Sequence, residues 1–235
     1  MVVLGERFLS ALVFAGELHR NQTRKGTVIP YVGHLLAVAA LAVEHGADED
    51  TAIAALLHDA VEDQGGHRTA EWILERFGPK VHETVLACTD SFTEPKPAWA
   101  PRKQTYLARL ATASPEARLV TACDKLHNAR SILADYRELG EELWSRFAGR
   151  REGTLWYYRA VLDALAKHGS SRLLEELERV VSEIERAAGR ERLMRYIYGE
   201  ESHDHQEQEH PTDGQHQEDD RRVLGGLQQG PEEGA

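Results

Sequence analysis

The amino-acid sequence predicts an all-α fold, and three features of the chain support this prediction. Apolar residues recur at intervals of three and four along successive segments, as they do on the buried face of an amphipathic helix. Glycine and proline separate these segments, and no segment shows the convincing apolar–polar alternation of a half-buried strand. The 235 residues, 41% of them hydrophobic, suffice for one sizeable core, so we expect one folded domain.

The expected helices follow from the apolar spacing and from the breaks between segments. In chain order they span 4–19, 34–46, a segment that carries 54–63, 69–77, 80–88, 103–113, 117–136, 143–168 and 171–198. Gly46 should end the second helix, and Asp48 or Asp50 should cap the start of the third. Residues 90–101 contain three prolines, which predict a long loop, and such loops often serve as lids.

The composition changes after Gly199, where Glu, Asp, Gln, His and Gly dominate. A segment with so few large apolar residues cannot bury a core. We therefore expect a folded domain at 1–198 and a disordered, acidic, His-rich tail at 199–235. Its four histidines are better explained by a solvated tail than by a metal site.

Charge and cysteine content limit the classes of function. A formal net charge of −11 argues against binding to nucleic acid, because its phosphates would be repelled. Cys88 and Cys123 lie in apolar settings and offer no disulfide framework, which indicates a reducing compartment. No leader and no apolar stretch of membrane-spanning length is present, so we expect a cytoplasmic protein that is not bound to a membrane.

The stretch 54–63, AALLHDAVED, places four polar residues at the end of an apolar run. In one continuous helix, His58 lies one turn before Glu62, and Asp59 lies one turn before Asp63. Like charges this close raise one another's pKa unless a cation lies among them, and a divalent metal is the usual cation. The alternative interpretation is a solvated acidic face with an incidental histidine.

A metal bound at this stretch needs ligands from other elements, and His34 and Asp124 are the candidates. His34 opens an apolar helix, and Asp124 lies among apolar residues, where an unpaired carboxylate is costly. A helix-capping role for His34, or an ion pair of Asp124 with Arg130, would also explain them. Asn128 and Ser131 follow Asp124 on the same helix face and could hold a ligand beside the metal.

Four ordered motifs resemble the HD-domain metal-dependent phosphohydrolases. They are RKGTVIPYVGH at 24–34, HDAVED at 58–63, FG at 77–78 and CDKLHNARS at 123–131. Together they are similar to the hydrolase domain of the RelA/SpoT family, and especially to the single-domain small alarmone hydrolases. The resemblance covers about residues 8–170 and implies an HD-type helical bundle.

By position, the resemblance implies one metal ion per chain, usually manganese (Mn²⁺). The matching ligands are His34, His58, Asp59 and Asp124. It also implies a catalytic acidic pair, which corresponds to Glu62 and Asp63.

The resemblance further implies contacts to a nucleotide. The matching residues are Arg24, Lys25, Asn128 and Ser131, with Arg102 and Lys103 as a basic pair near phosphate. Many members of the family have threonine at the position of Ser131, and serine keeps the hydroxyl group. The sequence departs from the family at Leu35, which replaces a usual proline, in the loop after Lys25 and in the proline-rich loop before Arg102. The aromatic residue that closes on the substrate corresponds to Trp156, Tyr157 or Tyr158.

The activity that the resemblance implies is hydrolysis of guanosine 3′-diphosphate 5′-(di/tri)phosphate, ppGpp or pppGpp, to GDP or GTP and pyrophosphate. Metal-activated water would attack the phosphorus on the ribose 3′ oxygen. One alternative keeps the metal site but acts on an adenine alarmone such as ppApp or on NADPH. Another is a nucleotide-binding module without turnover, against which an intact acidic pair argues. The expected partner is a nucleotide, and homo-oligomer formation stays open.

Overall fold

The structure is a computed structural model that describes residues 3–92 and 95–198, with side chains as far as Gly189. The tail expected at 199–235 lies outside these residues. Within them the fold is all-α, as predicted, with ten α-helices and one 3-10 helix. An isolated bridge between Thr23 and Pro30 is the one strand-like pairing of the described part. No described helix is both long and apolar enough to cross a bilayer.

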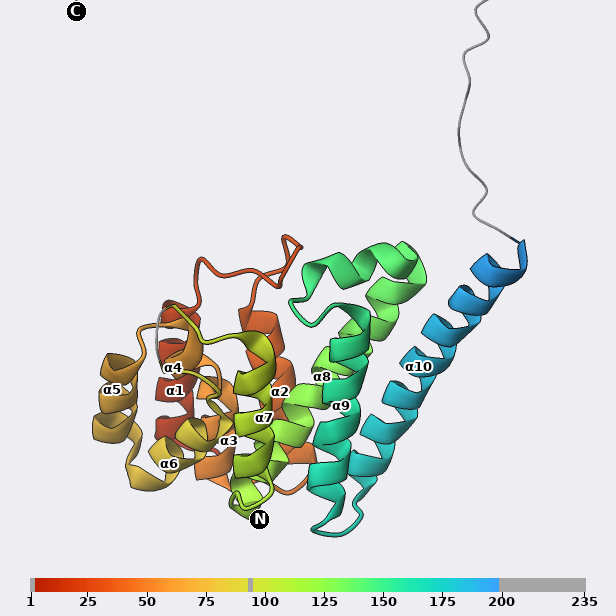
Figure 1. Cartoon of the computed structure of the whole chain (residues 1–235). Helices are drawn as coiled ribbons and strands as arrows, with labels where there is room; N and C mark the ends of the chain where they lie inside the picture. The colour runs from red at the N-terminus through yellow and green to blue at the C-terminus, as the bar shows by residue number, and fades with distance from the viewer. Residues whose placement is uncertain (1–2, 93–94, 199–235) are drawn as a thin grey trace, which may run out of the picture. The chain divides into compact units, whose positions relative to one another are not determined.

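Figure 1 shows the order and arrangement of the helices, with α5 at one end of the domain and α10 at the other. Their bounds are α1 (Glu6–Leu18), α2 (Val32–Glu44), α3 (Glu49–Leu57), α4 (Ala60–Asp63), α5 (His67–Phe77), α6 (Pro79–Cys88), α7 (Trp99–Leu110), α8 (Pro115–Leu139), η1 (Gly140–Arg146), α9 (Arg150–Ala166) and α10 (Arg172–Tyr198).

Helix α3 is the centre of the core. Every residue from Thr51 to Leu57 is buried, because α1, α2, α6 and α8 all pack against it. A helix that is apolar on all sides is stable only when it is enclosed in this way. Of the two predicted caps, Asp48 is the one that caps its first turn, and it accepts a hydrogen bond from the Thr51 N–H at 2.9 Å. The enclosed helix therefore delivers its last residue, and His58 after it, into the interior.

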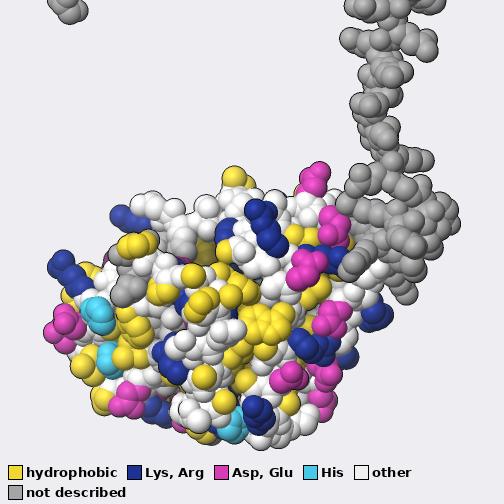
Figure 2. All heavy atoms as spheres, in the orientation of Figure 1, with side chains coloured by type: hydrophobic (Ala, Val, Ile, Leu, Met, Phe, Trp, Pro, Cys, Tyr) yellow, Lys and Arg dark blue, Asp and Glu magenta, His cyan; other side chains and the backbone are white. Residues whose placement is uncertain are grey.

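Helices α8 and α10 complete the domain on the other side. The 25-residue α8 packs against α2, α3, α6 and α10, and its buried face includes Asp124. Acidic and basic side chains are interspersed on the side of the molecule where α9 and α10 lie (Figure 2). Arg159 pairs with Glu185 there, and Arg137 pairs with Glu183. The predicted Glu- and Arg-rich helix thus turns a charged face outward.

The prediction of one helix through 54–63 was wrong, because the chain breaks at His58 and Asp59 between α3 and α4. The His58 ring donates a hydrogen bond from Nδ1 to the Ala55 carbonyl at 2.8 Å. In a continuous helix that carbonyl accepts from the N–H of residue 59 instead. His58 and Asp59 keep right-handed helical backbone angles, so the break is local.

The two largest further differences from prediction both involve Trp99. Helix α7 begins at Trp99 rather than near residue 103, because Pro101 lies in its first turn, where a missing N–H costs nothing. The predicted helix at 143–168 is divided into η1 and α9. Between them, a Cβ on Gly149 would lie 2.7 Å from the Trp99 ring, so the chain needs glycine at this close approach.

Candidate metal centre

The four predicted metal ligands come together from three parts of the core. His34 lies in the first turn of α2, His58 and Asp59 form the break between α3 and α4, and Asp124 lies in the middle of α8. Because α2 and α8 both pack on α3, the three elements converge at one point. Both imidazoles and Asp124 are buried there.

The distances between these side chains describe a compact cluster. His34 Nε2 lies 3.2 Å from Asp124 Oδ1 and 3.6 Å from Asp59 Oδ2. His58 Nε2 lies 3.0 Å from Asp59 Oδ2 and 3.6 Å from Asp124 Oδ1. Ligand atoms of His34, His58 and Asp59 all lie within 4.8 Å of one another. Each of the two imidazole nitrogens therefore lies within 3.6 Å of one oxygen of Asp59 and one oxygen of Asp124.

The chemistry of these atoms fits a divalent metal ion. The Nε2 atoms of His34 and His58 are fully buried and have no hydrogen-bond partner within the described part of the chain. A buried polar atom without a partner is costly, and a bound cation removes that cost. Because His58 Nδ1 faces a carbonyl, which can only accept, its proton is on Nδ1 and Nε2 is free to bind a metal.

Electrostatics lead to the same conclusion. Burial by itself lowers the pKa of His58, but the nearby carboxylates of Asp59 and Asp124 outweigh it and raise the pKa well above the usual range. These carboxylates therefore attract positive charge to the cluster. A divalent ion can supply that charge in place of a proton, so metal binding here should release protons.

A second layer of side chains holds these ligands. The Tyr31 hydroxyl donates to Asp59, while Asn128 and Lys125 donate to the two oxygens of Asp124. The alternative ion pair of Asp124 with Arg130 is wrong, because Arg130 pairs with Glu176. His34 does not cap its helix through its side chain either, since the ring is buried against its neighbours.

His34 has one further neighbour, His127 of α8. The two Nδ1 atoms lie 2.8 Å apart. Burial, together with the nearby His34 and Arg24, lowers the pKa of His127 to about 4, so its ring is neutral at physiological pH. A neutral imidazole can accept a hydrogen bond through one nitrogen.

Glu62 and Asp63 form a separate acidic pair beside the cluster. They do not stack on His58 and Asp59 as a continuous helix would require; instead, both bind Lys96 Nζ, at 2.9 Å and 3.2 Å. Burial and the charge of Asp90 raise the pKa of Glu62, and Lys96 opposes this rise. A partly buried carboxylate with a raised pKa is a stronger proton acceptor than an ordinary carboxylate.

The predicted basic residues occupy different positions. Arg24 donates to Asn128 at 2.7 Å, which places its guanidinium group next to the residues that hold Asp124. Lys103 binds Asp90 and lies 4.7 Å from the centre of the Tyr157 ring. Arg102 also binds Asp90 and holds its pKa low, at about 2, together with Lys103.

Two predicted substrate residues lie apart from these contacts. Lys25 is exposed in the loop after α1. The Ser131 hydroxyl donates to the carbonyl of His127, on its own helix, at 3.1 Å. Their role toward a nucleotide stays a prediction.

Sequence reasoning missed several residues of the site. Lys96 lies between two prolines in a segment without periodicity, and Asp90 lies in a loop position without a distinguishing pattern, whereas Tyr31 lies inside the motif at 24–34. His127 stands inside the motif at 123–131, and its position three residues after Asp124 could have indicated a neighbouring helix face.

The fold and this cluster define a helical domain with a buried histidine–aspartate centre suited to one divalent metal ion. The chain belongs to the HD-domain family, whose model it matches over residues 11–155. The predicted resemblance to the RelA/SpoT hydrolases and small alarmone hydrolases is confirmed by individual relatives.

Two of these relatives carry the name guanosine-3′,5′-bis(diphosphate) 3′-pyrophosphohydrolase MESH1. The chain is 39% identical to the Xenopus tropicalis protein over 140 residues, which cover 58% of this chain and 73% of the relative. It is 37% identical to the Homo sapiens protein over 131 residues, which cover 54% and 69%. A solved structure described as a metazoan ortholog of SpoT that hydrolyzes ppGpp superposes with a TM-score of 0.66 at 29% identity, and covers 80% of this chain and 99% of its own.

We expect Asp124→Asn to weaken manganese binding by more than about 100-fold, since residues that only support a ligand already contribute 10–100-fold. The change keeps the shape of the side chain but removes the charge that faces both imidazoles. Isothermal titration of metal-stripped protein with Mn²⁺ measures this directly. Asp163→Asn, the same change at an exposed position of α9, is the control. Equal affinities of the two variants would exclude Asp124 from the site.

Proposed function

We propose that the protein hydrolyses ppGpp and pppGpp to GDP and GTP with release of pyrophosphate. One observation carries the proposal: all four side chains of the cluster lie inside the HD-domain match, in a chain whose relatives are named for this reaction. The acidic pair and several cations adjoin the cluster, as attack of water on a polyanionic substrate requires.

We propose His34, His58, Asp59 and Asp124 as the ligands and Mn²⁺ as the ion. Mixed nitrogen and oxygen donors of this kind suit manganese among other divalent ions. When bound, the metal lowers the pKa of a water molecule and polarises a phosphate oxygen. We infer a cytoplasmic location from the nucleotide substrate and from the two free cysteines, Cys88 and Cys123.

The side chains of the site have separate tasks. Glu62, with its raised pKa, accepts the proton of the attacking water, and Asp63 beside it orients that water. Arg24 and Asn128 form a hydrogen-bonded pair that we assign to the nucleoside side of the substrate. Lys96, Arg102 and Lys103 supply positive charge for the phosphates, which the overall charge of −11 would otherwise repel.

The test is an assay of metal-stripped protein with Mn²⁺ added back. Inorganic pyrophosphate and orthophosphate are measured in parallel with ppGpp, pppGpp, ppApp and NADPH as substrates. We expect Mn²⁺-dependent release of pyrophosphate from ppGpp and pppGpp. Release of orthophosphate from NADPH alone, or of pyrophosphate from ppApp alone, would agree with the proposed metal centre. Either result would contradict ppGpp and pppGpp as the substrates. Bound metal without any turnover would indicate a nucleotide-binding module.

We expect Glu62→Gln to lower kcat by about 10²–10⁴, the usual contribution of a general base. The metal content should stay that of the unmodified protein, because the Glu62 carboxylate binds Lys96 rather than the imidazoles. Glu75→Gln, on the exposed face of α5, is the matched control. Unchanged turnover of Glu62→Gln would show that another group accepts the proton.

We expect Lys96→Met to move the acidic limb of the pH profile of kcat/KM to higher pH. A general base works when deprotonated, so activity is lost as the pH falls through its pKa. Burial and Asp90 raise the pKa of Glu62, whereas Lys96 lowers it, so removal of Lys96 should raise that pKa further. Lys80→Met, which removes a surface partner of Asp48, is the control. A limb that stays in place, or moves to lower pH, would contradict the role of Glu62.

A further inference from the structure

The two imidazoles of the centre are held in different ways. His58 Nδ1 donates to the backbone carbonyl of Ala55, an acceptor that no side-chain substitution removes. His34 Nδ1 instead lies 2.8 Å from Nδ1 of His127, so a side chain supplies its partner. The orientation of His34 therefore depends on the identity of residue 127.

The hydrogen bond between these two nitrogens needs one proton, which lies either on His34 Nδ1 or on His127 Nδ1. Metal binding at His34 determines which of the two nitrogens carries it. His34 Nε2 can bind a metal only when it carries no proton, which places the proton on Nδ1. Nδ1 of His127 must then be the acceptor, with the His127 proton on Nε2. From this geometry we propose that His127 is a positioning residue that keeps His34 in its metal-binding tautomer.

The other tautomer of His34 is a real competitor. A proton on Nε2 would lie close to two carboxylates, because Asp124 Oδ1 is 3.2 Å and Asp59 Oδ2 is 3.6 Å from this nitrogen. The carboxylates of the centre therefore favour the His34 tautomer with its proton on Nε2. This tautomer cannot bind metal through Nε2. His127 offsets this preference when it accepts through Nδ1, because that hydrogen bond forms only with the tautomer that carries the proton on His34 Nδ1.

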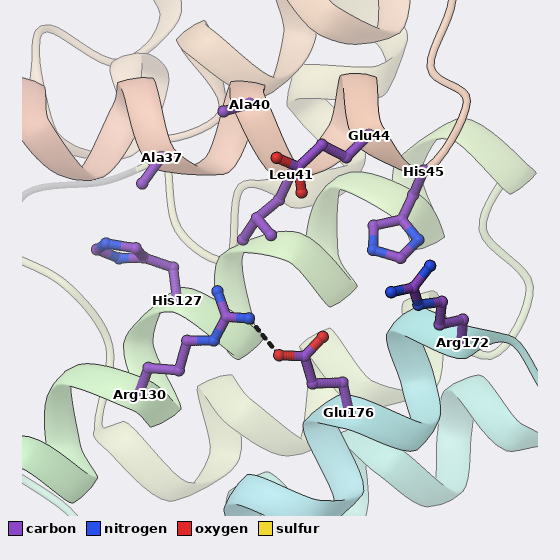
Figure 3. Close-up of a pocket in the computed structure, with 9 residues that line it drawn as sticks. All are labelled: Ala37, Ala40, Leu41, Glu44, His45, His127, Arg130, Arg172 and Glu176. Carbon is purple, nitrogen blue, oxygen red and sulfur yellow. Dashed lines mark hydrogen bonds and ion pairs between the residues drawn. The ribbon is translucent and has the colours of Figure 1, made fainter.

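The surroundings of His127 leave this hydrogen bond in control of the ring. His127 lies at the edge of a cavity of about 560 Å³ between α2, α8 and α10, and its ring stands apart from the Arg130–Glu176 ion pair (Figure 3). The rings of His127 and His34 are tilted, with centres 4.9 Å apart, so the contact runs through the ring edges. The cavity also gives space for other side chains at position 127.

The test compares the Mn²⁺ affinity of metal-stripped variants by isothermal titration. His127→Phe keeps a ring of similar size but has no acceptor, and we expect it to bind Mn²⁺ about 10–100-fold more weakly, as for other partners of metal-bound histidines. His127→Asn places an amide oxygen at the same number of bonds from the backbone as Nδ1. It should restore the affinity to within about threefold of the unmodified protein, on the same principle.

His45→Phe is the matched control, because His45 lines the same cavity without contacting a ligand of the centre. It should leave the Mn²⁺ affinity unchanged. Unchanged affinity of His127→Phe, or equal loss in His127→Phe and His127→Asn, would overturn the proposal, since the latter result indicates packing rather than hydrogen-bond acceptance.

A measurement on the unmodified protein keeps the inference testable if His127→Phe does not fold. The ring nitrogens of ¹⁵N-histidine-labelled, Zn²⁺-loaded protein report the tautomers, and we expect the proton on Nε2 of His127 and on Nδ1 of His34. A proton on Nδ1 of His127 would overturn the proposal. The inference rests on the proposed metal centre. Failure of the unmodified protein to bind either metal refutes that centre, whereas metal binding with the wrong tautomer refutes this inference alone.

Discussion

The structure depends on one constraint: two buried imidazoles and two carboxylates must come together in the core. Such a cluster is costly without a cation, and it forms only where the backbone is fixed from several directions. Helix α3 meets this requirement because α1, α2, α6 and α8 enclose it on all sides. The break after Leu57 then places His58 and Asp59 between α2 and α8, which supply His34 and Asp124. The apolar packing of the bundle thus stabilises the arrangement that the polar residues alone would not adopt.

Charge around the site is balanced locally, although the chain as a whole is acidic. Lys96 joins Glu62 and Asp63, Lys125 joins Asp124, and the pair Arg102 and Lys103 joins Asp90. Each cation is thereby fixed in position by a carboxylate before any phosphate meets it. Fixed charges stabilise a developing negative charge better than mobile ones, because no reorganisation is needed at the moment of reaction. Acidic residues at this site therefore also hold basic residues in position.

The sequence predicted the helical class and the helices that carry His34 and Asp124, because apolar spacing and glycine or proline breaks are local signals. The break at His58 could not be predicted from these local signals, because it accompanies a hydrogen bond from the His58 ring to the Ala55 carbonyl. The division of the helix expected at 143–168 depends on Trp99, which is distant in sequence and packs against Gly149. Lys96 has no local signal at all, because only the folded chain brings it to Glu62. The roles of the residues that the structure brings together remain predictions.

One turn of α8 links the metal centre to the nucleotide side of the proposed site. Asp124 faces the imidazoles, and Asn128, four residues later, donates to Asp124 and accepts from Arg24 at 2.7 Å. A continuous chain of hydrogen bonds therefore runs from the loop after α1 to a carboxylate of the centre. A shift of Arg24 that breaks its bond to Asn128 frees the amide that holds Asp124, and so changes the support of a metal ligand. The loop after α1 and the centre are thus connected through side chains that neither local periodicity nor helix propensity alone would bring together.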